Sequence, residues 1–194
     1  MQIRLGELTE MPPSPAAPAT AVPPTRPPSA DSQARLLLLI DVFSETKASK
    51  GIEGRMKLAK LDFLLRYPDR FTTLMAVRRP NVDAGENPWL TGTIEQSMIR
   101  YRYGPWDPAY YALLGALTGK GLIEPKHEDA VATYCTTQVG HEVARALAES
   151  ESWSPVRDRA VLLRRHFNLS GITLKNLIYE TFPDIVEADW GTQL

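Results

Sequence analysis

The order of the segments between residues 108 and 149 constrains the fold more than any other feature of the chain. Apolar residues recur at helical spacing, two short strand-like runs follow around a polar turn, and helical spacing then returns. The predicted boundaries are a helix at 108–120, a strand at 122–124, a turn at 125–129, a strand at 131–137 and a helix at 138–149. The apolar stripes are Tyr110, Leu113, Leu114 and Leu117 in the first helix and Val143 and Leu147 in the second.

This order is typical of a winged-helix unit, in which two strands and their turn form the wing and the preceding helix is the recognition helix. We therefore predict a mainly α fold with a small β-hairpin wing, namely a winged helix-turn-helix with extra helices at both ends. A general α+β core is the alternative, because helix–hairpin–helix segments also occur in other folds.

The chain divides into three predicted parts. Residues 1–30 form a disordered, proline-rich tail, because proline removes backbone donors and the stretch offers little apolar surface to bury. The alternative for this tail is a ligand segment that a proline-binding domain recognises. Residues 31–183 form the winged-helix domain. Residues 184–194 form an acidic and apolar tail that contains Trp190 and either docks on a partner or folds back on its own domain.

Further helices are predicted on both sides of the wing unit. They span 31–46, with a cap at Asp31-Ser32 and burial on more than one side, 56–67, 69–78, 154–168 and 170–182. In the second of these, Lys57, Lys60 and Asp62 are expected to point away from the apolar face. Loops are predicted at 48–55 and 79–92.

Residues 97–103 alternate between apolar and basic side chains, which predicts a strand with one solvated face. Ile99 and Tyr101 are expected on the inner face, and Arg100 and Arg102 on the solvated one. Residues 104–108 read as a turn in which Asp107 caps the following helix.

The predicted recognition helix lacks the side chains that read base edges. Its outer face offers alanine and glycine, whereas direct readout uses Arg, Lys, Asn or Gln. Small residues instead allow another helix or backbone to approach closely. We therefore predict partner docking at Ala109, Ala112 and Ala116, with Trp190 as a further docking residue in the tail.

Basic residues form the candidate contacts to nucleic acid or to an acidic partner. Arg157, Arg164 and Arg165 are expected on one arc of a helix whose inward stripe is Val156, Ala160, Leu163 and Phe167. The other candidates are Arg100, Arg102, Lys120 and Lys126. Ordinary solvated faces with local acidic partners are the alternative. Because the net charge is −1, the whole chain does not grip nucleic acid electrostatically.

No catalytic, metal or cofactor site is predicted, and we do not expect an enzyme. The histidines are scattered and the chain has one cysteine, Cys135, which excludes the usual zinc spacings. Residues 115–120 lack the spacing of a phosphate-binding loop, and no serine lies in a nucleophile-elbow pattern. The single thiol and the lack of a long apolar run predict a cytoplasmic protein without membrane contact.

Two segments resemble a known family. KLAKLDFLLRYP (Lys57–Pro68) and MIRYRYGPWDPAYYALLGALTGKGLIE (Met98–Glu124) are similar to the winged-helix middle components of bacterial three-component ABC-ATPase systems. The resemblance covers most of Gln33–Phe182 and brings no catalytic motif with it.

The resemblance implies a small adaptor with two larger partners. One is an ABC-type ATPase with a coiled coil, similar to structural-maintenance-of-chromosomes (SMC) ATPases, and the other is an effector-bearing component. Such systems are associated with defence against phage and other mobile DNA. A winged-helix DNA-binding transcriptional regulator, for which a homodimer would be usual, and an antitoxin-like binding protein are the alternatives.

Overall fold

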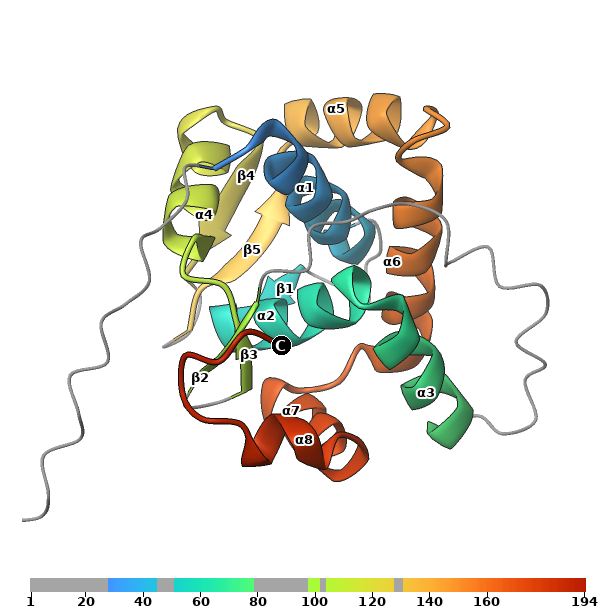
Figure 1. Ribbon diagram of the computed structural model, residues 1–194. Coiled ribbons are helices and arrows are strands. Elements are labelled where there is room, and N and C mark those ends of the chain that lie inside the picture. The colour runs from blue at the N-terminus through green and yellow to red at the C-terminus, as the bar shows by residue number, and fades with distance from the viewer. Residues whose placement is uncertain (1–27, 45–50, 79–97, 102–103, 128–130) are drawn as a thin grey trace, which may run out of the picture.

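The computed structural model describes residues 28–44, 51–78, 98–101, 104–127 and 131–194. This part of the chain is mainly helical, with a three-stranded antiparallel sheet and a separate two-stranded ribbon (Figure 1). Its elements are α1 (Ala30–Ser44), β1 (Ile52–Glu53), α2 (Gly54–Arg66), α3 (Pro68–Arg78), β2 (Ile99–Tyr101), β3 (Gly104–Trp106), α4 (Tyr110–Gly119), β4 (Ile123–Lys126), β5 (Thr133–Thr136), α5 (Gln138–Ala148), α6 (Ser154–Phe167), α7 (Gly171–Thr181) and α8 (Pro183–Glu187). Most of the predicted proline-rich tail, the predicted loop at 79–92 and Arg102 lie outside the described residues.

Helix α1 is the centre of the core. Every residue from Arg35 to Phe43 is buried, and the helix lies between α4 with its sheet on one side and α6 on the other (Figure 1). The prediction that this helix is buried on more than one side is confirmed. Its N-terminus differs from the predicted one, because the Ser29 hydroxyl accepts a hydrogen bond from the Ser32 amide at 3.1 Å and the helix begins at Ala30.

The three-stranded sheet has the order β1-β5-β4, so the first strand in sequence pairs with the last. Ile52 lies opposite Tyr134, and Ile123 lies opposite Thr136. The predicted loop at 48–55 is therefore wrong in its second half. Gly51 precedes β1 with a φ of 115°, and a Cβ there would lie 2.4 Å from the Tyr134 carbonyl oxygen, so the close pairing of β1 with β5 requires glycine.

The helix and strands between 108 and 149 occur in the predicted order. The stripe of α4 is confirmed, since Tyr110, Leu113, Leu114 and Leu117 are all buried. Strand β4 extends further than predicted and includes Pro125. The predicted inner face of α5 is wrong at Val143, which is exposed, but Leu147 packs against the core, and Gly140 and Ala144 are buried.

Close backbone packing explains the orientation of α5. A Cβ on Gly140 would lie 1.8 Å from the Leu122 carbonyl oxygen, so the glycine lets the helix contact the chain just before β4 directly. The spacing of large apolar residues does not reveal a helix face that packs through glycine and alanine. This is why the sequence pattern selected Val143 as an inner residue in place of Gly140 and Ala144.

The charged residues of α2 are buried rather than directed to solvent, which corrects a second prediction. Lys57, Lys60 and Asp62 are 8%, 1% and 0% exposed. Helix α2 contacts α6, α7 and β3, and elements on several sides leave it no solvated face at these positions. Asp62 is compensated by Arg35, whose Nε donates to its carboxylate at 2.8 Å.

Strands β2 and β3 pair antiparallel, with Ile99 opposite Trp106. Residues 104–106 are thus a strand and not the predicted turn. The predicted faces of β2 are also reversed, because Arg100 is 6% exposed and Tyr101 is 49% exposed. The guanidinium of Arg100 lies over the ring of Tyr179 in α7, 5.4 Å from its centroid, so α7 covers the side that was expected to be solvated.

The C-terminal residues fold back on the domain. Beyond Pro183, where a helix end was predicted, the chain continues as α8, and Ile185 enters the core. The last residues then run beside β2: the Gly191 amide donates to the Arg100 carbonyl at 2.7 Å, and the Leu194 amide donates to the Met98 carbonyl at 2.9 Å. Of the two alternatives for this tail, the structure has the folded-back one, seen in Figure 1 as the red segment that ends near α2.

Candidate functional site

The exposed side of α4 is the strongest candidate for a binding surface. We call it the α4 face, and it consists of Tyr111, Ala112, Gly115, Thr118 and Gly119, all of which are exposed. Of the three alanines predicted to dock a partner, Ala112 belongs to this face. Ala116 is half-buried, and Ala109 packs against the core.

Tyr111 is the residue of this face that sequence reasoning missed. It is 61% exposed, and the Arg55 guanidinium lies 4.7 Å from the centroid of its ring. Tyrosine and arginine are enriched among the residues that dominate protein–protein binding energy. The helical spacing that buries Tyr110 also turns its neighbour Tyr111 outward, so the pattern contained this information. The nearness of Arg55 follows only from the fold.

A buried network of charged groups fixes α4 against α1 and α2. Asp62 accepts hydrogen bonds from Arg35 Nε and from the Tyr110 hydroxyl, both at 2.8 Å. Arg66 Nη1 lies 3.6 Å from Asp62 and donates to Asp107 at 2.7 Å. Because these side chains come from three helices and the segment before α4, the network sets the position of the α4 face.

The protonation states of this network follow from its contacts. Burial opposes the charged carboxylate, but Arg35 and Arg66, with hydrogen bonds from Arg35 and Tyr110, hold the pKa of Asp62 below its ordinary value. Burial and the charge of Asp62 raise the pKa of Tyr110 well above its ordinary value. Asp62 is therefore ionised and Tyr110 remains a hydrogen-bond donor at neutral pH.

Asp107 leads the chain into α4 rather than capping it directly. Its Oδ1 accepts from the Ala109 amide at 2.8 Å, while the helix begins at Tyr110, two residues later than predicted. The carboxylate is thus shared between this turn and Arg66. One acidic residue couples the entry of α4 to the buried network.

The predicted basic contacts do not form one patch. Lys120 donates to the Gln33 side chain at 2.6 Å, and Lys126 pairs with Glu124 at 3.0 Å. Arg100 is buried in β2. These three residues lie on separate elements, and the charged group of each already has a contact within the chain.

The predicted arginine arc of α6 also separates. Arg157 pairs with Asp158 at 3.2 Å, and Arg164 donates to the Val42 carbonyl of α1 at 2.6 Å. Arg165 is exposed. The inward stripe of this helix is confirmed, because Val156, Ala160, Leu163 and Phe167 are buried. Arg164 therefore contributes to the packing of α6 against α1, in addition to any contact that it makes with a partner.

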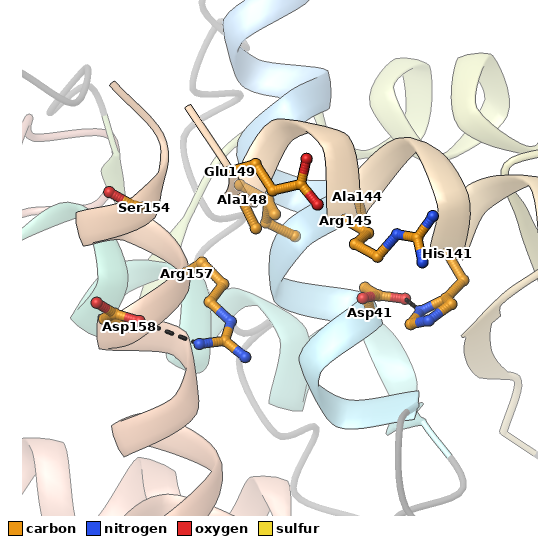
Figure 2. A pocket seen from close by; sticks show the side chains of 10 residues that line it. Asp41, His141, Ala144, Arg145, Ala148, Glu149, Ser154, Arg157 and Asp158 are labelled. Carbon is orange, nitrogen blue, oxygen red and sulfur yellow. Dashed lines mark hydrogen bonds and ion pairs between the residues drawn. The ribbon is translucent and has the colours of Figure 1, made fainter. Parts of the chain in front are cut away.

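A cavity of about 550 Å³ lies between α1, α5 and α6 (Figure 2). Acidic and basic side chains alternate around the cavity, so its lining has no strong net charge of either sign. His141 Nδ1 lies 3.0 Å from Asp41 Oδ1, and the Thr136 hydroxyl donates to the same oxygen at 3.0 Å. The polar lining consists of Asp41, His141, Arg145, Glu149, Ser154, Arg157 and Asp158.

This pair resembles part of a catalytic triad, but the arrangement is not that of a nucleophile site. Ser154 lies across the cavity and points away from the His141–Asp41 pair in Figure 2. The Thr136 hydroxyl already donates a hydrogen bond to Asp41. Within the described part of the chain, no group of three or more His, Cys, Asp or Glu side chains is arranged to hold a metal ion.

Comparisons with known proteins add no relative to this picture: no family model, no curated protein and no solved structure matches the chain. Among the described residues, no helix is both long and apolar enough to span a membrane.

Proposed function

We propose that the protein is a non-catalytic winged-helix adaptor, the middle subunit of a three-component ABC system that bridges an SMC-like ATPase and a larger effector component. The biological setting is cytoplasmic defence against phage or mobile DNA. The observation that carries the proposal is the α4 face, which presents an exposed tyrosine on a base of small residues and none of the Arg, Lys, Asn or Gln side chains that most often read base edges.

The strand order supports the winged-helix part of the proposal. In a winged helix, the strand between the first two helices joins the wing hairpin in one antiparallel sheet. Here β1 follows α1 and pairs with β5, and β5 pairs with β4. On this proposal, helix α4, directly before the hairpin, corresponds to the recognition helix. Helix α3 and the β2–β3 ribbon would then be insertions between α2 and α4.

The chemistry of the α4 face favours a protein partner over a duplex. Small side chains at Ala112, Gly115 and Gly119 let a partner helix or strand approach the α4 backbone closely. Tyr111 adds a large, rigid contact area whose ordering costs little entropy. Arg55 beside its ring adds one positive charge, which suits an acidic group on the partner.

The alternative, a DNA-binding regulator, draws support from exposed basic residues, which include Arg55, Arg78, Lys120, Lys126, Arg145 and Arg165. They lie on different elements and form no single patch, whereas affinity for DNA grows with the number of simultaneous phosphate contacts. Sequence-specific readout would also need base-reading side chains on α4. The adaptor proposal therefore fits the surface better.

Co-expression with the reading frames that flank its gene tests the proposal, which expects an ABC-type ATPase and an effector among their products. We expect the tagged chain to co-purify with both products, and to bind duplex DNA weakly and without sequence preference at physiological salt. Arg55→Ala combined with Arg165→Ala serves as the probe of DNA contact. Tight binding of the isolated chain to one DNA sequence, without co-purification of an ATPase, would overturn the adaptor proposal.

A further inference from the structure

A cluster of basic side chains lies between α2, β2 and α7, away from the α4 face. Lys60 comes from α2, Arg100 from β2, and Lys175 and Tyr179 from α7. The Arg100 guanidinium and the Lys175 ammonium lie 5.4 Å and 5.9 Å from the centroid of the Tyr179 ring. Three positive charges thus surround one phenol.

Several polar groups of this cluster have no partner. Lys60 is 1% exposed and Arg100 is 6% exposed, yet the Arg100 Nε and the Tyr179 hydroxyl are buried without a hydrogen bond. No carboxylate among the described residues pairs with the Lys60 ammonium. Buried donors without acceptors are rare in folded proteins and costly. The Lys60 ammonium and the Arg100 Nε can only donate, and the cluster contains no anionic acceptor for them.

The space beside Gly104 brings two of these donors together. A Cβ at that position would lie 3.6 Å from the Tyr179 hydroxyl oxygen and 3.9 Å from Lys60 Nζ, with no atom nearer than 3.4 Å. The Tyr179 hydroxyl and the Lys60 ammonium therefore both lie beside the side-chain position of Gly104. The φ of Gly104 is 107°, so the backbone already requires glycine and a side chain is excluded from the gap.

The charged groups of the cluster are all positive. Burial, followed by the charges of Lys175 and Arg100, lowers the pKa of Lys60 to about 8. At neutral pH the ammonium is therefore mostly protonated and is buried beside two like charges. An anion between them would relieve both the repulsion and the missing acceptors.

We propose that Lys60, Arg100, Lys175 and Tyr179 form a binding site for a phosphate-sized oxyanion. The near-complete burial of Lys60 excludes the backbone of a duplex and leaves a small ion or a terminal phosphate group as the ligand. Lys175 and Tyr179 are only partly buried, so this edge of the cluster is open to solvent. The ligand is free phosphate or the terminal phosphate of a nucleotide.

Binding of inorganic phosphate to the full chain tests the site, by calorimetry and by thermal unfolding against chloride at equal ionic strength. We expect one saturable site and a Tm that rises with phosphate concentration. Lys60→Met should abolish the phosphate effect. Tyr179→Phe, which removes only the hydroxyl, should weaken binding about tenfold. Lys120→Met, a change at an exposed lysine, should leave binding unchanged.

The unfolding temperature without phosphate separates this site from a structural role. Removing an unpaired buried charge should leave Lys60→Met as stable as the parent chain, or more stable. Marked destabilisation or failure of this variant to fold would show that the ammonium has a structural partner and would overturn the proposal. So would an equal phosphate effect in the parent chain and in Tyr179→Phe.

Adenosine monophosphate distinguishes the two sources of the ligand. Competition with phosphate at higher affinity supports a nucleotide, and failure to compete supports the free ion. The site is independent of the adaptor proposal, because loss of phosphate binding leaves the α4 face intact.

Discussion

Lys60 and Asp62 lie two residues apart on α2, and both are buried, yet their surroundings differ. Asp62 has Arg35, Arg66 and Tyr110 as partners, whereas Lys60 faces only like charges among the described residues. The sequence could not separate these cases. Spacing predicted that both side chains leave the apolar face, and only the covering helices decide whether that side meets solvent or other charges.

Removal of the Asp62 charge is expected to destabilise the fold severely. In Asp62→Asn, Arg35 would remain buried without its carboxylate, and breaking a buried pair in this way typically costs about 3–5 kcal/mol. Urea unfolding at neutral pH measures this. Asp184→Asn is the matched control, because it breaks the exposed Arg70–Asp184 pair and should cost about 1 kcal/mol or less. Equal losses in the two variants would contradict the role of the network.

Lys60 is expected to make stability increase at alkaline pH. Its pKa is about 8 in the folded chain and ordinarily 10.5, so between these values the unfolded chain binds more protons. The free energy of unfolding therefore rises with pH from about 8 to about 10.5 as the penalty of the buried charge is removed. The difference between the parent chain and Lys60→Met isolates this contribution from other titrating groups. A difference that does not change over this window would contradict the buried, unpaired ammonium.

At the scale of the element, patterns of large apolar residues predicted α4 and α6 with their correct inner faces. They failed where packing does not depend on such residues. Strand β1 has two residues, too few for an alternation to appear. Strand β2 is covered by α7 and by the C-terminal residues, which lie far away in the sequence. The small residues of the α4 face were predicted, but Tyr111 and Arg55 were not.

Two glycines at helical positions should respond oppositely to the same change. Gly140→Ala would place a methyl group 1.8 Å from the Leu122 carbonyl oxygen, so α5 must shift and stability should fall by about 1–3 kcal/mol. Gly115 has no atom within 4 Å of such a methyl group, and Gly115→Ala should stabilise by about 0.5–1 kcal/mol through helix propensity. Thermal unfolding measures both. A stable Gly140→Ala variant would contradict the close contact of α5 with the chain before β4.

At the scale of the whole molecule, the nearly neutral charge and the surface of α4 both disfavour recognition of DNA sequence. The net charge of −1 provides no general attraction to nucleic acid. The surface with the best features for binding is instead one of small residues around Tyr111. The small residues could be predicted from the sequence, whereas the anchoring of α4 through Asp62 and Arg66 could be recognised only in the structure.

The affinity of the chain for the SMC-like ATPase that we propose as its partner, measured for two matched variants, tests the proposed docking role of the α4 face most directly. Ala112→Arg places a bulky charge on this face, and Ala76→Arg makes the same change at an exposed position of α3, on the other side of the molecule in Figure 1. We expect Ala112→Arg to weaken binding about 30-fold or more, as for a change at the centre of an interface, and Ala76→Arg to have little effect. Both variants should remain folded. Undiminished binding by folded Ala112→Arg, or equal weakening by the two variants, would contradict the assignment of the α4 face as the docking surface.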